Sequence, residues 1–121
     1  MQTDFSIPTI LSASSLNDAS VESPQGEGLG KIRELMVDLE DGRIAYVLLS
    51  FGGALGIGEK LIAIPWGAVY LDTMHQVIVL DVDRETLENA PSFDIDDWPD
   101  AYDRSWVANL YDHYGYRPYW K

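Results

Sequence analysis

The residue types that most often carry catalysis or hold a metal ion are scarce in this chain. Its 121 residues include no cysteine and only two histidines, His75 and His113. Neither histidine has a second ligand at the spacing of a metal site, and no nucleophile can be paired with a base from the pattern. We therefore expect no catalytic residue, no metal and no cofactor, and a protein that is not an enzyme.

A glycine-rich stretch, Gly53-x-x-Gly56-x-Gly58, invites comparison with phosphate-binding loops. Nucleotide-binding fingerprints run Gly-x-Gly-x-x-Gly and open a helix, whereas here the order is reversed and a strand is expected to follow. Glycine also permits the positive φ angles of sharp turns. The predicted role is structural, and the predicted turn glycines are Gly42, Gly52, Gly53, Gly56 and Gly58.

An acidic run precedes the C-terminal part of the chain. It consists of Asp94, Asp96, Asp97, Asp100 and Asp103. Calcium requires several converging oxygen ligands, and the glycine of the EF-hand loop pattern is missing. We interpret this run as a solvated surface that also supplies a helix cap.

The overall charge limits the classes of partner. Twenty acidic and eight basic residues give a formal net charge of −12. Nucleic acids and anionic lipids carry the same sign, so we expect neither as a partner and favour a protein with a basic face. The longest apolar run, Ile44 to Leu49, is far too short for a membrane span, and no secretory signal is visible. A cytoplasmic protein is expected.

The elements that would position any site are mainly strands. The apolar residues Leu35, Val37 and Leu39 occupy every second position. They alternate with Glu34, Met36 and Asp38, which predicts a strand with one apolar face. Asp41-Gly42 predicts a hairpin turn, and the run 44–51 is apolar on both faces, as in a central strand.

Further short strands are expected at 19–22, 60–64, 69–71 and 76–82, followed by a short helix capped by Asp83. The connections leave no room for crossover helices, so we predict antiparallel pairing. The expected fold is mainly β, a small antiparallel six-stranded barrel, since closure removes unpaired edges.

The C-terminal part differs in composition, because nine of the fourteen aromatic residues lie in residues 93–121. Tyr102, Trp106, Leu110 and Tyr114 are four residues apart, which predicts one stripe on a helix at about 101–114. Asp100 is the expected N-cap, and Gly115 is expected just after the helix.

Several motifs together resemble the PRC-barrel domain. They are Gly30 to Asp38, Gly42 to Val47, Phe51 to Lys60 and Ile64-Pro65-Trp66. The resemblance covers about residues 10–91 and implies a barrel domain over 1–92 that acts as a docking module. The aromatic-rich segment 93–121 looks like the extension found on stand-alone bacterial members of that family.

These observations favour a non-catalytic interaction module that forms a homodimer and docks a protein partner. The predicted interface residues are Trp98, Tyr102, Trp106, Leu110, Tyr114, Tyr119 and Trp120. Whether they pack on their own barrel or on a second chain is left open by the sequence. The alternative is a barrel that binds a small molecule or lipid cofactor, lined by Tyr46 and Trp66.

Overall fold

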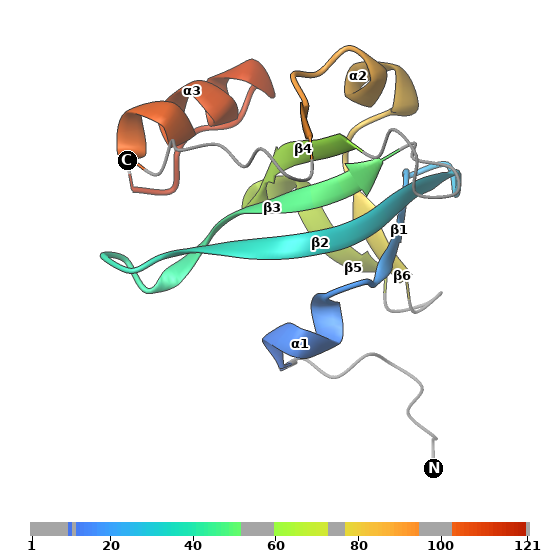
Figure 1. The fold of residues 1–121 in the computed structure, drawn as a ribbon, viewed down its shortest axis with the longest axis horizontal. Helices are drawn as coiled ribbons and strands as arrows, with labels where there is room; N and C mark the ends of the chain where they lie inside the picture. Colours follow the sequence, from blue (N-terminus) through green and yellow to red (C-terminus); the bar gives the residue numbers. More distant parts are fainter. Residues whose placement is uncertain (1–9, 11, 52–59, 73–76, 95–102, 121) are drawn as a thin grey trace.

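The computed structural model describes residues 10, 12–51, 60–72, 77–94 and 103–120 (Figure 1). The predicted turn glycines Gly52, Gly53, Gly56 and Gly58 lie outside these residues. The strands are β1 (Ser20–Glu22), β2 (Gly28–Asp38), β3 (Arg43–Phe51), β4 (Lys60–Pro65), β5 (Val69–Asp72), β6 (Val77–Leu80) and β7 (Phe93–Asp94). The helices are α1 (Ala13–Leu16), α2 (Arg84–Glu88) and α3 (Arg104–His113), and a 3₁₀ turn spans Trp66–Ala68.

All seven strands form one sheet in the order β5-β6-β1-β2-β3-β4-β7. The expected purely antiparallel arrangement is wrong, because Val21 of β1 lies opposite Ile78 of β6 in a parallel pair. Parallel pairing needs a long crossover but not a helix. Here β2 to β5 together form the crossover, so the fold is a mixed sheet.

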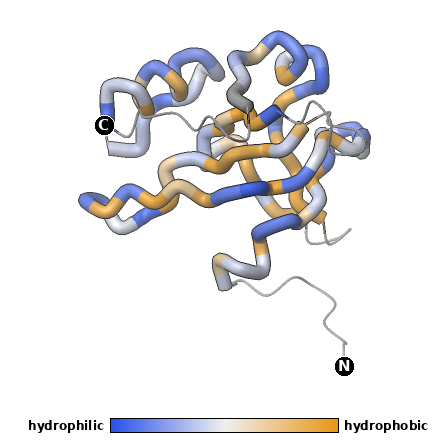
Figure 2. Tube along the Cα trace, viewed as in Figure 1, coloured by the Kyte–Doolittle hydropathy of each residue, from blue (hydrophilic) through white to orange (hydrophobic). Residues whose placement is uncertain are grey.

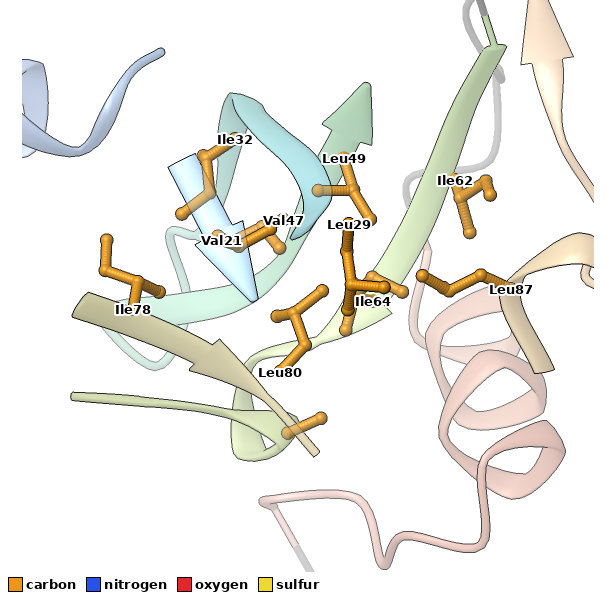
Figure 3. Packing of buried hydrophobic residues seen from close by; sticks show 11 residues of the cluster. Val21, Leu29, Ile32, Val47, Leu49, Ile62, Ile64, Ile78, Leu80 and Leu87 are labelled. Atoms are coloured by element: carbon orange, nitrogen blue, oxygen red, sulfur yellow. The ribbon is translucent and has the colours of Figure 1, made fainter. Parts of the chain in front are cut away.

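The sheet curls into a half-barrel around an aliphatic core (Figures 1 and 3). Its two end strands, β5 and β7, are not paired with each other among the described residues, so the described ladder is open rather than closed. The core, called the inner cluster below, consists of Val21, Leu29, Ile32, Val47, Leu49, Ile62, Ile64, Ala68, Ile78, Leu80 and Leu87.

A second cluster lies on the other side of the sheet. This outer cluster consists of Ala45, Tyr46, Leu48, Leu61, Ala63, Val107 and Tyr111. It joins β3 and β4 to α3, so the C-terminal segment covers the outer face of these two strands (Figure 1).

The prediction that residues 44–51 form a central strand is confirmed. β3 pairs with β2 on one side and β4 on the other. Val47 and Leu49 pack in the inner cluster, while Tyr46 and Leu48 pack in the outer cluster. The middle of β3 is correspondingly hydrophobic in Figure 2. A strand covered on both faces needs apolar residues at consecutive positions, which is the pattern in the sequence.

The predicted apolar face of β2 is wrong beyond Leu35. Leu35 packs against the inner cluster, but Val37 is 55% exposed and Leu39 is 89% exposed. The pairing register shifts between Met36 and Val37. At this shift β2 advances by one residue, from Met36 to Val37, while β3 advances by two, so the extra residue is Ala45 of β3. Val37 and Leu39 are exposed because they lie on the projecting hairpin, beyond the inner cluster.

Gly30 allows the backbone of β2 to lie very close to that of β3. Its φ angle is +143°, and a Cβ atom placed there would lie 2.1 Å from the carbonyl oxygen of Ser50. No other residue can occupy this position without moving the backbone. β2 begins at Gly28. This is well before Leu35, where the alternating pattern in the sequence begins.

The short helix α2 begins as predicted, with the Asp83 carboxylate accepting a hydrogen bond of 2.8 Å from the backbone N–H of Thr86. This interaction with Thr86 lowers the pKa of Asp83. Leu87 points into the inner cluster, so α2 closes one end of the core (Figure 3).

Helix α3 has Asp103 as its N-cap, and the Asp103 carboxylate accepts from the N–H of Trp106 at 2.9 Å. The predicted N-cap, Asp100, lies outside the described residues. At the other end Gly115 has a φ of +78°, and the N–H of Tyr116 donates to the carbonyl of Tyr111 at 2.8 Å. This is a Schellman ending, which turns the chain back towards the sheet.

Candidate functional site

The described aromatic side chains of residues 103–120 that pack against a cluster lie on the chain's own sheet. The rings of Trp106 and Tyr46 are 5.2 Å apart, and Leu110, Tyr119 and Trp120 also pack against the outer cluster. Tyr114 packs against the inner cluster instead. The predicted interface residues Trp98 and Tyr102 lie outside the described residues.

The most buried residues of α3 are two that the sequence analysis did not select. Val107 is 5% exposed and Tyr111 is 3% exposed. The Tyr111 hydroxyl donates a 2.6 Å hydrogen bond to the carbonyl oxygen of Ala45, and burial raises the pKa of Tyr111. Val107 and Tyr111 are four residues apart, as are the residues of the predicted stripe. Each directly follows a stripe residue in the sequence, so the same helical spacing could have selected them.

Asp38, at the end of β2, ties the C-terminal segment to the hairpin. The hydroxyl of Tyr119 donates to Asp38 Oδ2 at 2.5 Å, and Arg104 Nη2 lies 3.2 Å from the same oxygen. The hydrogen bond from Tyr119 is the largest cause of the lowered pKa of Asp38. Burial, followed by the same hydrogen bond, raises the pKa of Tyr119.

Arg104 connects the start of α3 to three carboxylates of the hairpin. Besides Asp38, its guanidinium lies 3.1 Å from Asp41 and 3.4 Å from Glu40. The hydrogen bond to Asp41 is the main reason for the raised pKa of Arg104. The guanidinium also stacks over the ring of Trp120 at 4.8 Å. Arg104 is thus held in place by the hairpin carboxylates and by the ring of Trp120.

A groove of about 620 Å³ lies between the β2–β3 hairpin and α3. It is lined by Met36, Val37, Asp38, Leu39, Glu40, Ala45, Tyr46, Asp103, Arg104, Val107 and Tyr119. Apolar side chains from both elements face it, and charged groups surround its rim. A concave, mainly apolar surface with a few polar groups is the usual form of a binding site.

The hairpin beside this groove projects from the body of the molecule, and hydrophobic residues alternate with hydrophilic ones near its tip (Figures 1 and 2). Leu39 lies in the turn itself, where Asp38 Oδ1 accepts from the N–H of Glu40 and Gly42 takes a φ of +66°. Gly42 is therefore a turn glycine, as predicted. A leucine that is almost fully exposed on a projecting turn suits an intermolecular contact.

A smaller cavity of about 350 Å³ lies on the other side of α3. It is lined by Ala63, Pro91, Trp106, Asn109, Leu110, His113 and Tyr114. The buried hydroxyl of Tyr114 makes no hydrogen bond among the described residues, and burial raises its pKa to about 12. His113 is exposed at the end of α3, where a basic side chain suits the helix dipole.

Comparison with known families now identifies the barrel. The model of the PRC-barrel domain family matches residues 8–87, which is about two thirds of the chain. The chain belongs to the PRC-barrel domain family. The family relationship that the sequence motifs suggested is thereby confirmed.

A relative of this PRC-barrel protein occurs in Deinococcus radiodurans. That protein is described only as an uncharacterized protein, and it is 30% identical over 95 residues. The match covers 68% of this chain but 35% of the relative, so the PRC-barrel chain spans about a third of the length of the curated protein that it matches.

Several predicted site residues are placed apart or fall outside the described structure. Tyr46 belongs to the outer cluster, whereas Trp66 packs against the inner cluster, so the two do not line one pocket. His75 lies outside the described residues, as do Asp96, Asp97 and Asp100 of the acidic run, and of Asp94 only the backbone, in β7, is described. Within the described residues no three acidic or histidine side chains are placed to hold a metal ion.

No helix in the described ranges of the chain is both long enough and apolar enough to cross a lipid bilayer.

Proposed function

We propose that this PRC-barrel protein is a non-catalytic docking module that binds a protein partner through the groove between the β2–β3 hairpin and α3. The observation that carries the proposal is the exposure of Val37 and Leu39 on the projecting hairpin, beside an apolar groove. Exposed apolar side chains next to a concave apolar surface are typical of interaction sites.

A non-catalytic role is supported by the way the polar groups of the groove contact each other. Asp38 accepts from Tyr119 and contacts Arg104, while Arg104 also contacts two further carboxylates. These interactions hold the groove in shape. A ligand-binding barrel is less favoured, because aliphatic side chains form the inner cluster and the two proposed lining residues belong to different clusters.

Self-association is the second part of the proposal. Trp106, Leu110 and Trp120 are only partly buried by the outer cluster, so each keeps some area for contact with a second copy. Light scattering of the full chain tests this part. A mass of twice 13.6 kDa supports the homodimer, and a mass of 13.6 kDa at all concentrations contradicts it.

The docking proposal is tested by capture from an extract of the native host. The bait is the full chain, compared with the double variant Val37→Ser, Leu39→Ser. The matched control is Tyr70→Ser, because Tyr70 is also an exposed hydrophobic residue but lies on β5. We expect a protein that binds the wild type and the control but not the double variant. Equal capture by all three would contradict docking at the hairpin.

A further inference from the structure

The groove between the hairpin and α3 combines an apolar floor with an acidic rim. Met36 and Ala45 from the hairpin and Val107 from α3 supply the apolar surface. Three carboxylates line the groove, those of Asp38, Glu40 and Asp103, and the carboxylate of Asp41 lies beside them, 3.1 Å from Arg104. The side chain of Glu40 is 81% exposed and so can reach a bound molecule.

The basic groups near the rim do not balance these carboxylates. Arg104 lies within ion-pair distance of Asp38, Glu40 and Asp41 at once. The guanidinium of Arg43 stacks over the ring of Tyr119 at 4.6 Å. These four carboxylates thus outnumber the two guanidinium groups, and the remaining negative charge adds to the field of a chain whose net charge is −12.

We propose that the groove binds a short protein segment in which apolar side chains are flanked by lysine or arginine. This inference rests on the proposed docking function and names the class of partner. Apolar side chains of the segment fill the floor beside Val107, and its cationic groups pair with Glu40 and Asp103, the exposed carboxylates of the lining. Complementary charge raises the rate of encounter and excludes partners of the wrong sign.

The same charges disfavour the other occupants of such a groove. A nucleic acid or an anionic lipid would bring negative phosphates to the rim. A second copy of this chain would bring another net charge of −12. Like-charge contacts oppose binding unless other interactions exceed them.

The test uses the full chain labelled with ¹⁵N and two short synthetic peptides with identical leucine positions. In one peptide the polar positions are lysine, and in the other they are glutamate. We expect the lysine peptide to shift the backbone amide signals of Val37, Leu39 and Val107. The glutamate peptide should bind at least about tenfold more weakly, because like charges at an interface are strongly unfavourable.

Charge-reversal variants show whether binding depends on the rim or only on the overall negative charge. Glu40→Lys should weaken the lysine peptide about tenfold, since it replaces attraction with repulsion at close range. Glu85→Lys changes the net charge equally, and Glu85 is an exposed residue on α2, away from the groove lining. It should change the affinity by less than about twofold, because salt screens distant charges.

Each other outcome overturns the inference in a different way. Equal binding of both peptides at the groove leaves docking intact but removes the requirement for a cationic partner. Shifts of the groove signals on concentrating the protein alone identify a second copy as the occupant. If neither peptide shifts these signals, the cationic segment is rejected, and the capture experiment with the hairpin variants decides separately whether the groove docks a protein.

Discussion

The two clusters on opposite sides of the β3–β4 region are built from different kinds of residue. The inner cluster is entirely aliphatic and is formed by strands, the 3₁₀ turn and α2. The outer cluster contains two tyrosines and is completed by α3 and the residues after it. The inner cluster therefore holds the barrel together, while the outer cluster attaches a segment that forms one wall of the groove.

The difference is sharpest at two neighbouring residues of β3. Leu48 and Leu49 are both fully buried, but Leu48 faces the outer cluster and Leu49 the inner one. We expect Leu49→Ala to destabilise the protein by about 4 kcal/mol and Leu48→Ala by about 2.5 kcal/mol, since α3 can move to fill part of the outer cavity. Urea unfolding measures both. A larger loss for Leu48→Ala would contradict this assignment of roles.

The next largest loss of stability is expected at Gly30, where the backbones of β2 and β3 lie close together. Gly30→Ala should cost about 3 kcal/mol, because the new Cβ would overlap the Ser50 carbonyl and the φ of Gly30 is positive. Gly28→Ala is the matched control, since nothing lies within 4 Å of a Cβ at that position. Thermal unfolding should separate the two variants clearly. Similar melting temperatures for the two variants would show that the backbones of β2 and β3 are further apart at this position.

The hydrogen bond between Tyr111 and Ala45 gives a smaller effect in the outer cluster. Tyr111→Phe leaves the buried carbonyl of Ala45 without this donor and should cost about 1 kcal/mol. Tyr70→Phe changes an exposed residue of β5 and should alter stability by less than about 0.5 kcal/mol. Denaturant midpoints compared at equal slope test the pair. An unchanged midpoint for Tyr111→Phe would indicate that water reaches Ala45.

The smallest expected effect concerns pH. The pKa of Asp38 is lowered in the folded protein, so its contribution to stability is present above the ordinary aspartate pKa of 3.8 and is lost as the pH falls through the lower folded pKa. Tyr119→Phe removes the main cause and should make the protein less stable near neutral pH but not at very low pH. Stability curves of both proteins against pH measure this difference. Parallel curves would show that Asp38 is not held by Tyr119.

The sequence predicted those parts of the fold that depend on local pattern. The continuous apolar run of β3 indicated a strand buried on both faces. Asp83 marked a helix start through its side-chain carboxylate, and Gly115 marked a helix end through its positive φ angle. The bulge between Met36 and Val37 had no such signal, because a bulge arises from pairing with another strand. The parallel contact of β1 with β6 was likewise unpredictable from neighbouring residues.

The candidate site was harder to predict than the fold. Asp38 and Tyr119 are 81 residues apart, and neither differs in type from many other acidic or aromatic residues of the chain. Their contact exists only because the Schellman ending at Gly115 returns the chain to the hairpin. The groove follows from that long-range contact, so its apolar floor and acidic rim are visible only in three dimensions.

The C-terminal segment of each chain packs on the sheet of the same chain and thereby forms the groove. Nuclear Overhauser effects between the rings of Trp106 and Tyr46, whose centroids are 5.2 Å apart, report this packing. The measurement is made on a uniformly labelled sample and, with isotope filtering, on a mixture of labelled and unlabelled chains. We expect a Trp106–Tyr46 contact in the uniform sample and no filtered contact between chains. A filtered Trp106–Tyr46 contact between labelled and unlabelled chains would contradict it.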